Sequence, residues 1–511
     1  MSMEKDVLTH AGRPRAGVRE WFGLGLLALP TVLLGLDVTV LYLVSPSIAA
    51  ELKPTPAQTL WIMDAYGFFI AGFLITMGTL GDRIGRRRLL MIGVAAFAAV
   101  SVVAAFAPNA GLLILSRALL GIAGATLMPS TLSLISNMFT DVRQRAVAIG
   151  VWATMFALGM AAGPIVGGAL VDRFWWGAAF LLAVPVAMIV LAGARTLLPE
   201  YAAPGEGRLD LISVTLSLVA ILPVVYAVKN FATHGVDVLT LLLLLIGLAA
   251  GIAFVRRQLR LASPLLDVTL FADRAFSAAL AVLLIGLVGV GGTMYLVTQF
   301  LQLVEGLSPA EAGLWMGPPA LAMFAAAIGA PIVAARIRPG KVMAATQGLS
   351  LIGYALLATA DTGSVVSVVI GFTFVYFGLG AIAALGTDIV VGAAPATKSG
   401  SAAAMSETVQ ELGLAVGVAL LGSLTTAVFR YQVQPPSQQV APEIAARATA
   451  SLDGAVAVSD RLPPGTVQGA QEAFITGLNV ASLTAGAAIV AVTMLCLLRL
   501  GHIRPIGETT P

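Results

Sequence analysis

Fourteen long apolar segments make up most of this 511-residue chain and limit the folds open to it. Each is long enough to cross the roughly 30 Å hydrocarbon core of a bilayer as an α-helix. Only 11% of the residues are charged, against about 25% in a soluble globular protein, so the chain requires a lipid environment. The sequence therefore predicts an all-α membrane protein, with spans near residues 21–44, 59–80, 89–107, 110–136, 146–170, 176–198, 211–230, 238–255, 276–304, 309–335, 342–360, 363–392, 401–429 and 476–498.

Basic residues are distributed unequally between the two sides of this arrangement. With the N-terminus placed inside, most of the 29 lysines and arginines fall in inside segments and few fall outside. Inside loops of membrane proteins are rich in Lys and Arg, so we expect both termini in the cytoplasm. No cleavable signal peptide is evident. Abundant alanine, and arginine that far outnumbers lysine, suggest a GC-rich bacterial genome, and we expect the protein in a bacterial plasma membrane.

Missing motifs and sparse residue types exclude several functions. The chain has no phosphate-binding G-x-x-x-x-G-K-[ST] loop and no HExxH motif. Its single cysteine, Cys496, excludes an internal disulfide and is expected to be a packing residue. The formal net charge of +3 is too small to suggest nucleic-acid binding. We therefore expect no cofactor, no metal and no enzymatic activity, and an ion gradient as the driving force for any uphill transport.

A glycine- and arginine-rich loop separates the second and third apolar segments. It contains Gly78, Asp82, Arg83, Gly85 and Arg86 in a fixed order, followed by two further arginines. Glycine permits a tight reversal and close helix approach, and Asp82 can accept hydrogen bonds at the turn. A cytoplasmic loop requires only positive charge, so this ordered set is more specific than its arginines alone.

The loop resembles the signature between spans two and three of the major facilitator superfamily. Six spans precede the polar stretch Pro199–Asp210, two follow it, and six more follow the basic stretch Arg256–Arg274. This grouping resembles the fourteen-span drug:proton antiporters of that superfamily, with two six-helix bundles and two inserted helices. Pro339-Gly340-Lys341 resembles a degraded copy of the loop, as expected for two halves related about the membrane normal.

The resemblance gives a domain plan for the whole chain. The outside loop 431–473 has two possible functions, and both stay open: it is a spacer, which is the simpler interpretation, or a lid over the outer opening. The plan comprises a cytoplasmic tail at 1–20, a first six-helix bundle at 21–198, a linker with two additional helices at 199–274, a second bundle at 275–498 that includes the outside loop 431–473, and a cytoplasmic tail at 499–511.

Asp37 and Arg117 are ionisable residues placed deep within predicted spans. Such residues are costly in a membrane and normally face a cavity or a partner. Because a buried arginine needs a counter-charge, Asp37 is one candidate partner for Arg117. One interpretation of this pair is a structural ion pair. The matching motifs in this family imply the other, in which the two residues couple transport to protons and Asp37 also contacts the substrate.

The second span offers a candidate site for a cation. Trp61 lies three residues before Asp64, so the indole and the carboxylate can share a helix face, and Tyr66 follows closely. A carboxylate beside an aromatic ring suits a lipophilic cation. An interfacial tryptophan with a snorkelling aspartate explains the same pattern, and the family resemblance favours the binding site.

A glycine stripe and two glutamates complete the candidate set. Glu407 and Glu411 lie four residues apart on one helix face, where at least one can hold an exchangeable proton, unless Glu407 is solvated. Glu411 is also a substrate-binding candidate. The stripe permits close helix packing, and its full string resembles the motif that marks antiporters. It comprises Gly159, Gly163, Pro164, Gly167 and Gly168.

The resemblance implies a multidrug exporter driven by the proton-motive force. Lipophilic cations, such as quaternary ammonium compounds, dyes and biocides, would exchange for protons by alternating access. The expected partners are these cations, protons and membrane lipids, and the family default is a monomer. Two alternatives stay open: a proton-coupled exporter of a specific lipid, peptide or metabolite, which would favour buried basic residues, and a non-transporting sensor or membrane enzyme.

Overall fold

The computed structural model describes residues 16–505, except 201–209, 235–236, 262–263, 265, 267, 395–398 and 435–439. Within this part of the chain every regular element is helical, which confirms the predicted all-α fold. Twelve helices are long and apolar enough to cross a membrane. The other two predicted spans are occupied by α9 (Leu211–His234) and by α14 (Pro339–Leu357).

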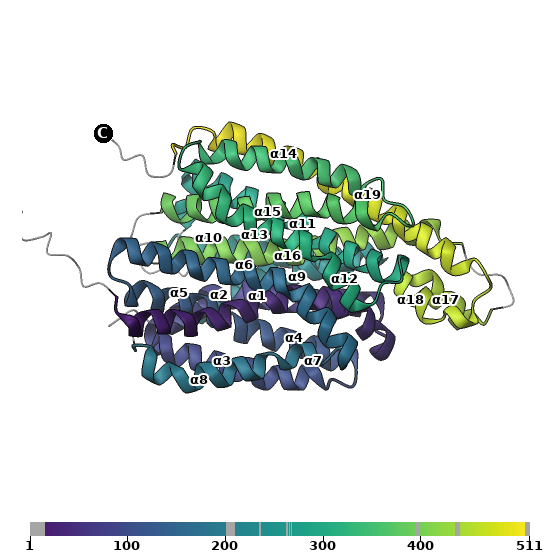
Figure 1. Ribbon diagram of the computed structural model, residues 1–511, viewed down its shortest axis with the longest axis horizontal. Coiled ribbons are helices and arrows are strands. Elements are labelled where there is room, and N and C mark those ends of the chain that lie inside the picture. The colour runs from purple at the N-terminus through teal and green to yellow at the C-terminus, as the bar shows by residue number, and fades with distance from the viewer. Residues whose placement is uncertain are drawn as a thin grey trace, which may run out of the picture.

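The first half of the chain forms one helical bundle (Figure 1). Helix α1 packs along α6, while α4 packs against α2 and α3. The predicted span at 110–136 is interrupted at Ala125–Thr126, between α4 and α5. The predicted span at 176–198 is interrupted at Leu182, between α7 and α8. The elements are α1 (Val18–Leu52), α2 (Pro56–Ile84), α3 (Arg86–Ala105), α4 (Ala110–Gly124), α5 (Leu127–Met138), α6 (Val142–Arg173), α7 (Ala178–Leu181) and α8 (Ala183–Leu197).

The second half forms a similar bundle in which α11 packs against α16, and α15 against α13 and α14. Cys496 is buried in it, as expected for a packing residue. The elements are α11 (Arg274–Gln299), η3 (Phe300–Val304), α12 (Pro309–Trp315), α13 (Gly317–Ala334), α14, α15 (Val365–Ala393), α16 (Ser399–Gln432), α19 (Thr466–Leu495) and η6 (Cys496–Leu500), preceded by the short η2 (Val268–Ala272).

The two halves lie side by side with their helices along the long axis of the molecule (Figure 1). Helix α2 contacts α16, and α6 contacts α12 and α13. Helix α1 begins and η6 ends at one end of the molecule, which we call the terminal end. At the opposite end, α17 (Pro442–Ala450) and α18 (Leu452–Ala457) pack over the bundles, and we call this the cap end.

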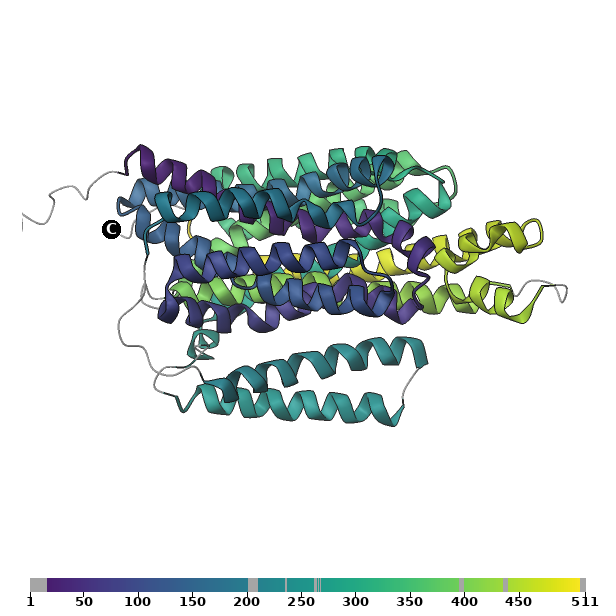
Figure 2. The same cartoon turned by 90° about the horizontal axis from the view of Figure 1, so that it is seen from below.

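The inserted pair, α9 and α10 (Val238–Gln258), lies beside the bundles as a hairpin (Figure 2). Arg257 donates hydrogen bonds to both carboxylate oxygens of Asp210, at 2.7 and 2.9 Å, and these hold the pKa of Asp210 at about 2. Helix α9 packs against both α2 and α16. It therefore covers the seam where the two halves meet, while α10 exposes leucines such as Leu245 and Leu248, as expected of a lipid-facing helix.

Candidate functional site

A buried ion pair joins three helices of the first half. Arg117 Nη1 on α4 donates to Asp37 Oδ2 on α1 at 2.7 Å, with the two side chains only 2% and 7% exposed. Arg117 Nε donates to the carbonyl oxygen of Ile62 at 3.2 Å, and the guanidinium lies 4.6 Å from the ring centroid of Tyr66. This confirms Asp37 as the counter-charge of Arg117 and adds a cation–π contact from α2.

Gly121, one turn after Arg117, explains why the arginine reaches α2. A Cβ at this position would lie 2.5 Å from the carbonyl oxygen of Tyr66 and 2.8 Å from Cβ of Phe69. Real Cβ atoms do not approach so closely, so only glycine lets α4 lie this near to α2. The spacing from Arg117 to Gly121 thus sets the arginine beside Ile62 and Tyr66.

The glycine stripe of α6 holds α1 in place. Added Cβ atoms at Gly159, Gly163 and Gly167 would collide with Val32, Thr39 and Val40 of α1. Thr39 Oγ1 also donates to the carbonyl oxygen of Met160 at 3.0 Å. Because Asp37 lies within this stretch of α1, the stripe fixes the height and rotation at which its carboxylate faces Arg117.

The last part of the motif connects α6 to the second half. A Cβ at Gly168 would collide with the carbonyl oxygen of Pro309, and one at Gly313 would collide with that of Pro164. Helices α6 and α12 therefore pack backbone to backbone toward the cap end. Gln302 adds a hydrogen bond from its Nε2 to the carbonyl oxygen of Leu43 at 2.9 Å, again between the halves.

Glu411 extends from α16 in the second half toward the ion pair. It is 6% exposed and lies against Gly67 of α2, where an added Cβ would be 3.9 Å from its Oε2. Its charge interacts with those of Asp37, Arg117 and Glu407. Glu407 itself is partly exposed, so Glu411 is the more deeply buried of the two glutamates.

Asp64 and Trp61 of α2 differ in burial. Asp64 is 1% exposed, whereas Trp61 is partly exposed. The Trp61 ring packs 6.4 Å from Phe68 and 6.0 Å from Tyr226 of α9. The indole thus contributes to the interface with the inserted hairpin, and its expected role in substrate binding stays a prediction.

The loop between α2 and α3 turns at Gly85, whose φ of +104° strongly favours glycine. Arg86 is buried against Gly81, while Arg83 is partly exposed and the Asp82 side chain lies outside the described residues. Glu200, after α8, accepts a hydrogen bond from Arg87 N at 3.2 Å and forms ion pairs with Arg87 and Arg88. Sequence analysis missed Glu200, because only the fold brings it to the loop.

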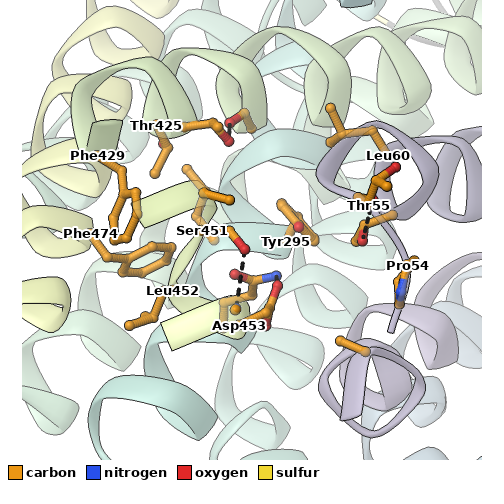
Figure 3. A pocket seen from close by; sticks show the side chains of 18 of the residues that line it. Pro54, Thr55, Leu60, Tyr295, Thr425, Phe429, Ser451, Leu452, Asp453 and Phe474 are labelled. Atoms are coloured by element: carbon orange, nitrogen blue, oxygen red, sulfur yellow. Dashed lines mark hydrogen bonds between the residues drawn. The ribbon is translucent and has the colours of Figure 1, made fainter. Parts of the chain in front are cut away.

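A second polar site, also missed from the sequence, lies at the cap end. Helices α17 and α18 form one wall of a cavity of about 300 Å³ (Figure 3). Within segment 431–473 these two helices pack over the bundles, and its function as a spacer stays a prediction. Its action as a lid stays a prediction.

Two helical bundles packed around a buried ion pair, with a hairpin over their seam, define a polytopic membrane transporter. The family model described as Major Facilitator Superfamily matches residues 27–418, and the chain belongs to this superfamily. It is therefore a multi-pass membrane transporter by family and not an enzyme.

Two relatives match along almost their full length. Multidrug efflux pump LfrA of Mycolicibacterium smegmatis is 41% identical over 482 residues, covering 93% of this chain and 95% of the relative. Methyl viologen resistance protein SmvA of Salmonella typhimurium is 34% identical over 494 residues, covering 94% and 97%.

A solved structure shares the fold. It is a bacterial homologue of the human lysosomal transporter Spinster, in an inward-facing and unoccupied conformation. The TM-score is 0.61, with 17% identity and coverage of 94% of this chain and 98% of that chain. At this identity the match establishes the architecture alone.

Proposed function

We propose that this protein is a multidrug efflux pump that exports lipophilic cations in exchange for protons. The observation that carries the proposal is the buried Asp37–Arg117 ion pair, approached by Glu411 from the other half. The similarity to LfrA and SmvA supports it, since those relatives are described as a multidrug efflux pump and a methyl viologen resistance protein. Methyl viologen is a flat aromatic dication, a chemistry that buried carboxylates suit.

Protonation of Asp37 provides a physical route from proton binding to helix movement. The ionised carboxylate holds Arg117, and the neutral acid attracts the guanidinium much less. Arg117 also contacts Ile62 and Tyr66, so its release would loosen α4 from both α1 and α2. Since α2 packs on α16, that loosening would reach the interface at which the halves rock.

The carboxylates of the two halves suit competition between protons and a cationic substrate. Asp37 and Asp64 come from the first half and Glu411 from the second, and Glu407 lies one turn before Glu411 on α16. A cation bound among them would lose its counter-charges as protons arrive. In this proposal Tyr66 contributes the aromatic contact, because its ring already accepts a cation in Arg117.

The proposal places the terminal end in the cytoplasm of a bacterial cell, with the cap end outside. The basic loops gather at the terminal end, including the Gly78–Arg88 loop, and cytoplasmic loops are the Arg- and Lys-rich ones. In this orientation the ion pairs of Glu200 with Arg87 and Arg88 hold that loop on the cytoplasmic side. The domain boundaries predicted from the sequence, and a monomeric state, form part of the same proposal.

Transport measured in proteoliposomes tests the proposal. Purified protein is reconstituted with an internal pH dye, a pH gradient is imposed, and ethidium or a quaternary ammonium compound is added. We expect substrate-dependent proton flux from the unaltered protein and none from Asp37→Asn. The control is Asp172→Asn, an exposed carboxylate at the end of α6, which should behave like the unaltered protein. Full export by folded Asp37→Asn would contradict the mechanism, and proton flux with a lipid, peptide or metabolite only would redirect the substrate assignment.

A further inference from the structure

The cavity at the cap end is built from three parts of the protein. The cap supplies one wall, and the two bundles supply the others, so the cavity spans the boundary between the halves. Its volume of about 300 Å³ is that of a small ligand site. Figure 3 shows its principal side chains, which include Thr55, Tyr295, Thr425, Phe429, Asp453 and Phe474.

Asp453 is the acid of this cavity. Gln299 Nε2 donates to its Oδ2 at 3.3 Å, whereas its Oδ1 is buried without a hydrogen-bond partner. Lys53 and Arg447 also line the cavity, yet among the described residues neither forms an ion pair with Asp453. The Asp453 side chain is half-buried, and leaving its buried Oδ1 without a partner is costly, so an added cation would stabilise this carboxylate.

Aromatic rings accompany this carboxylate. Phe429 of α16 and Phe474 of α19 lie together on one side of the cavity, and Tyr295 of α11 lies on another (Figure 3). Aromatic faces attract organic cations, and quaternary ammonium groups in particular are recognised by several rings at once. Hydroxyl groups from Thr55 and Thr425 contribute to a lining that combines polar and apolar side chains.

We propose that this cavity is a second, outer site for lipophilic organic cations, which substrate occupies after leaving the inner carboxylates. The proposal rests on the export function proposed above and identifies a place on its route. Asp453 supplies the counter-charge, and the three rings supply the apolar surface. Thr59 and Leu60 of α2 line the cavity, and Asp64 lies one turn further along the same helix, so the cavity adjoins the outermost of the inner carboxylates.

The two basic residues of the lining explain how such a site would release its occupant. Lys53 at the end of α1 is exposed, and Arg447 on α17 is partly exposed. Their charges oppose that of a bound cation, so the outer site is weaker than one made by a carboxylate alone. A weak site next to the outside favours release over capture.

Cysteine labelling tests the outer site without requiring transport. Thr426→Cys, at a position that lines the cavity, is combined with Cys496→Ser to give the parent variant, and the full chain is placed in lipid nanodiscs. The probes are a methanethiosulfonate carrying a trimethylammonium group and a neutral methanethiosulfonate of similar size. We expect Asp453→Asn to lower the preference for the cationic reagent by roughly tenfold, Asp453→Glu to retain it, and Arg447→Gln to increase it.

Protection by tetraphenylphosphonium assigns the effect to this cavity. The cation should slow labelling of the introduced thiol in the parent and in Asp37→Asn, but not in Asp453→Asn. Equal labelling and protection in Asp453→Asn and its parent would overturn the proposal. Protection lost in Asp37→Asn with Asp453 intact would also overturn it, because the inner site would then be responsible. Retained export by Asp37→Asn would contradict the proposed mechanism and leave this labelling result unaffected.

Discussion

The Asp37–Arg117 pair holds a buried carboxylate and the cap-end cavity a half-buried one, Asp453, and the two regions compensate the carboxylate charge in different ways. Asp37 has a fixed partner 2.7 Å away, held by an additional hydrogen bond and an aromatic ring. Asp453 has one long hydrogen bond and one oxygen without a partner, and the residue lines a cavity. In the proposed mechanism the fixed pair changes when Asp37 is protonated, whereas the cavity offers a site that a cation can enter and leave.

This difference predicts how each region responds to substitution. Removing one member of the fixed pair leaves the other buried and uncompensated, so both stability and coupling should suffer. Asp453 is half-buried and forms no ion pair within the described residues, so the fold should tolerate removal of its charge. The predictions below begin with the largest effect.

The largest effect is expected from Arg117→Met. Asp37 would then be buried without its counter-charge, at a cost of about 3–5 kcal/mol. We expect a strongly lowered unfolding temperature in detergent and no export of a cationic dye from proteoliposomes. Thermal unfolding and dye export, measured on the same preparations, check both parts.

A double variant separates stability from coupling. In Asp37→Leu with Arg117→Met neither charge remains, and replacing a buried ion pair by apolar side chains is often neutral for stability. We expect most of the lost thermal stability to return while export stays absent. Proton-coupled export by the double variant would show that the pair is structural alone.

The next effect concerns the packing that positions Asp37. Gly163→Val places side-chain atoms where Thr39 of α1 already lies, so α1 must move away from α6. We expect a poorly assembled protein with little export, measured by size-exclusion profile and transport. Gly150→Ala is the matched control, because the same helix offers open space at that glycine and the substitution should be harmless. Comparable behaviour of the two variants would contradict a close-packing role for the stripe.

The fold could be predicted from the sequence because its determinants are local. The lengths of the apolar runs predict the spans. The glycines of α6 predict close helix contacts, and those of the loop between α2 and α3 predict a turn. The Asp37–Arg117 pair was also predictable, since two isolated buried charges of opposite sign need one another. These inferences use only the helix length that a bilayer requires and the need of a buried charge for an opposite charge. They do not require knowing which helices are neighbours.

Glu200, Asp453 and the surroundings of Trp61 could not be predicted in this way. Glu200 and Asp453 are ordinary polar residues in loop-like sequence, and only the packed fold brings one to the arginine loop and the other over Tyr295. Trp61 packs on Tyr226 of the inserted hairpin, a contact that the sequence pattern did not indicate, and its role at a substrate site with Asp64 stays a prediction. Residues distant in sequence meet through tertiary packing, which periodicity does not report.

A smaller, graded effect is expected from pH at the outer site. Burial raises the pKa of Asp453 to about 6, with the Gln299 hydrogen bond opposing the shift. A raised carboxyl pKa means that the group is charged above that pH and neutral below it. The preference for the cationic reagent should therefore fall by roughly tenfold between about pH 7.5 and about pH 5.

Other ionisable side chains also line the cavity beside Asp453. They belong to Lys53 at the end of α1, Arg447 of α17 and Tyr295 of α11. Measurement of the ratio of cationic to neutral labelling rates across pH removes the pH dependence of the thiol itself. The same pH dependence in Asp453→Asn would assign the effect to another group.

The smallest effect is expected from Glu200→Gln, at an ion pair that is neither buried nor next to the cavity. The Glu200 side chain is 27% exposed and its partners Arg87 and Arg88 are 26% and 74% exposed. Exposed ion pairs contribute about 0.2–1 kcal/mol, so the unfolding temperature should barely change. Glu200 joins the end of α8 to a loop that would move in the proposed mechanism, so we expect a modest change in transport rate that fades at high salt. Loss of transport as complete as in Arg117→Met would contradict the prediction that substitutions at buried ion pairs have larger effects than those at exposed ones.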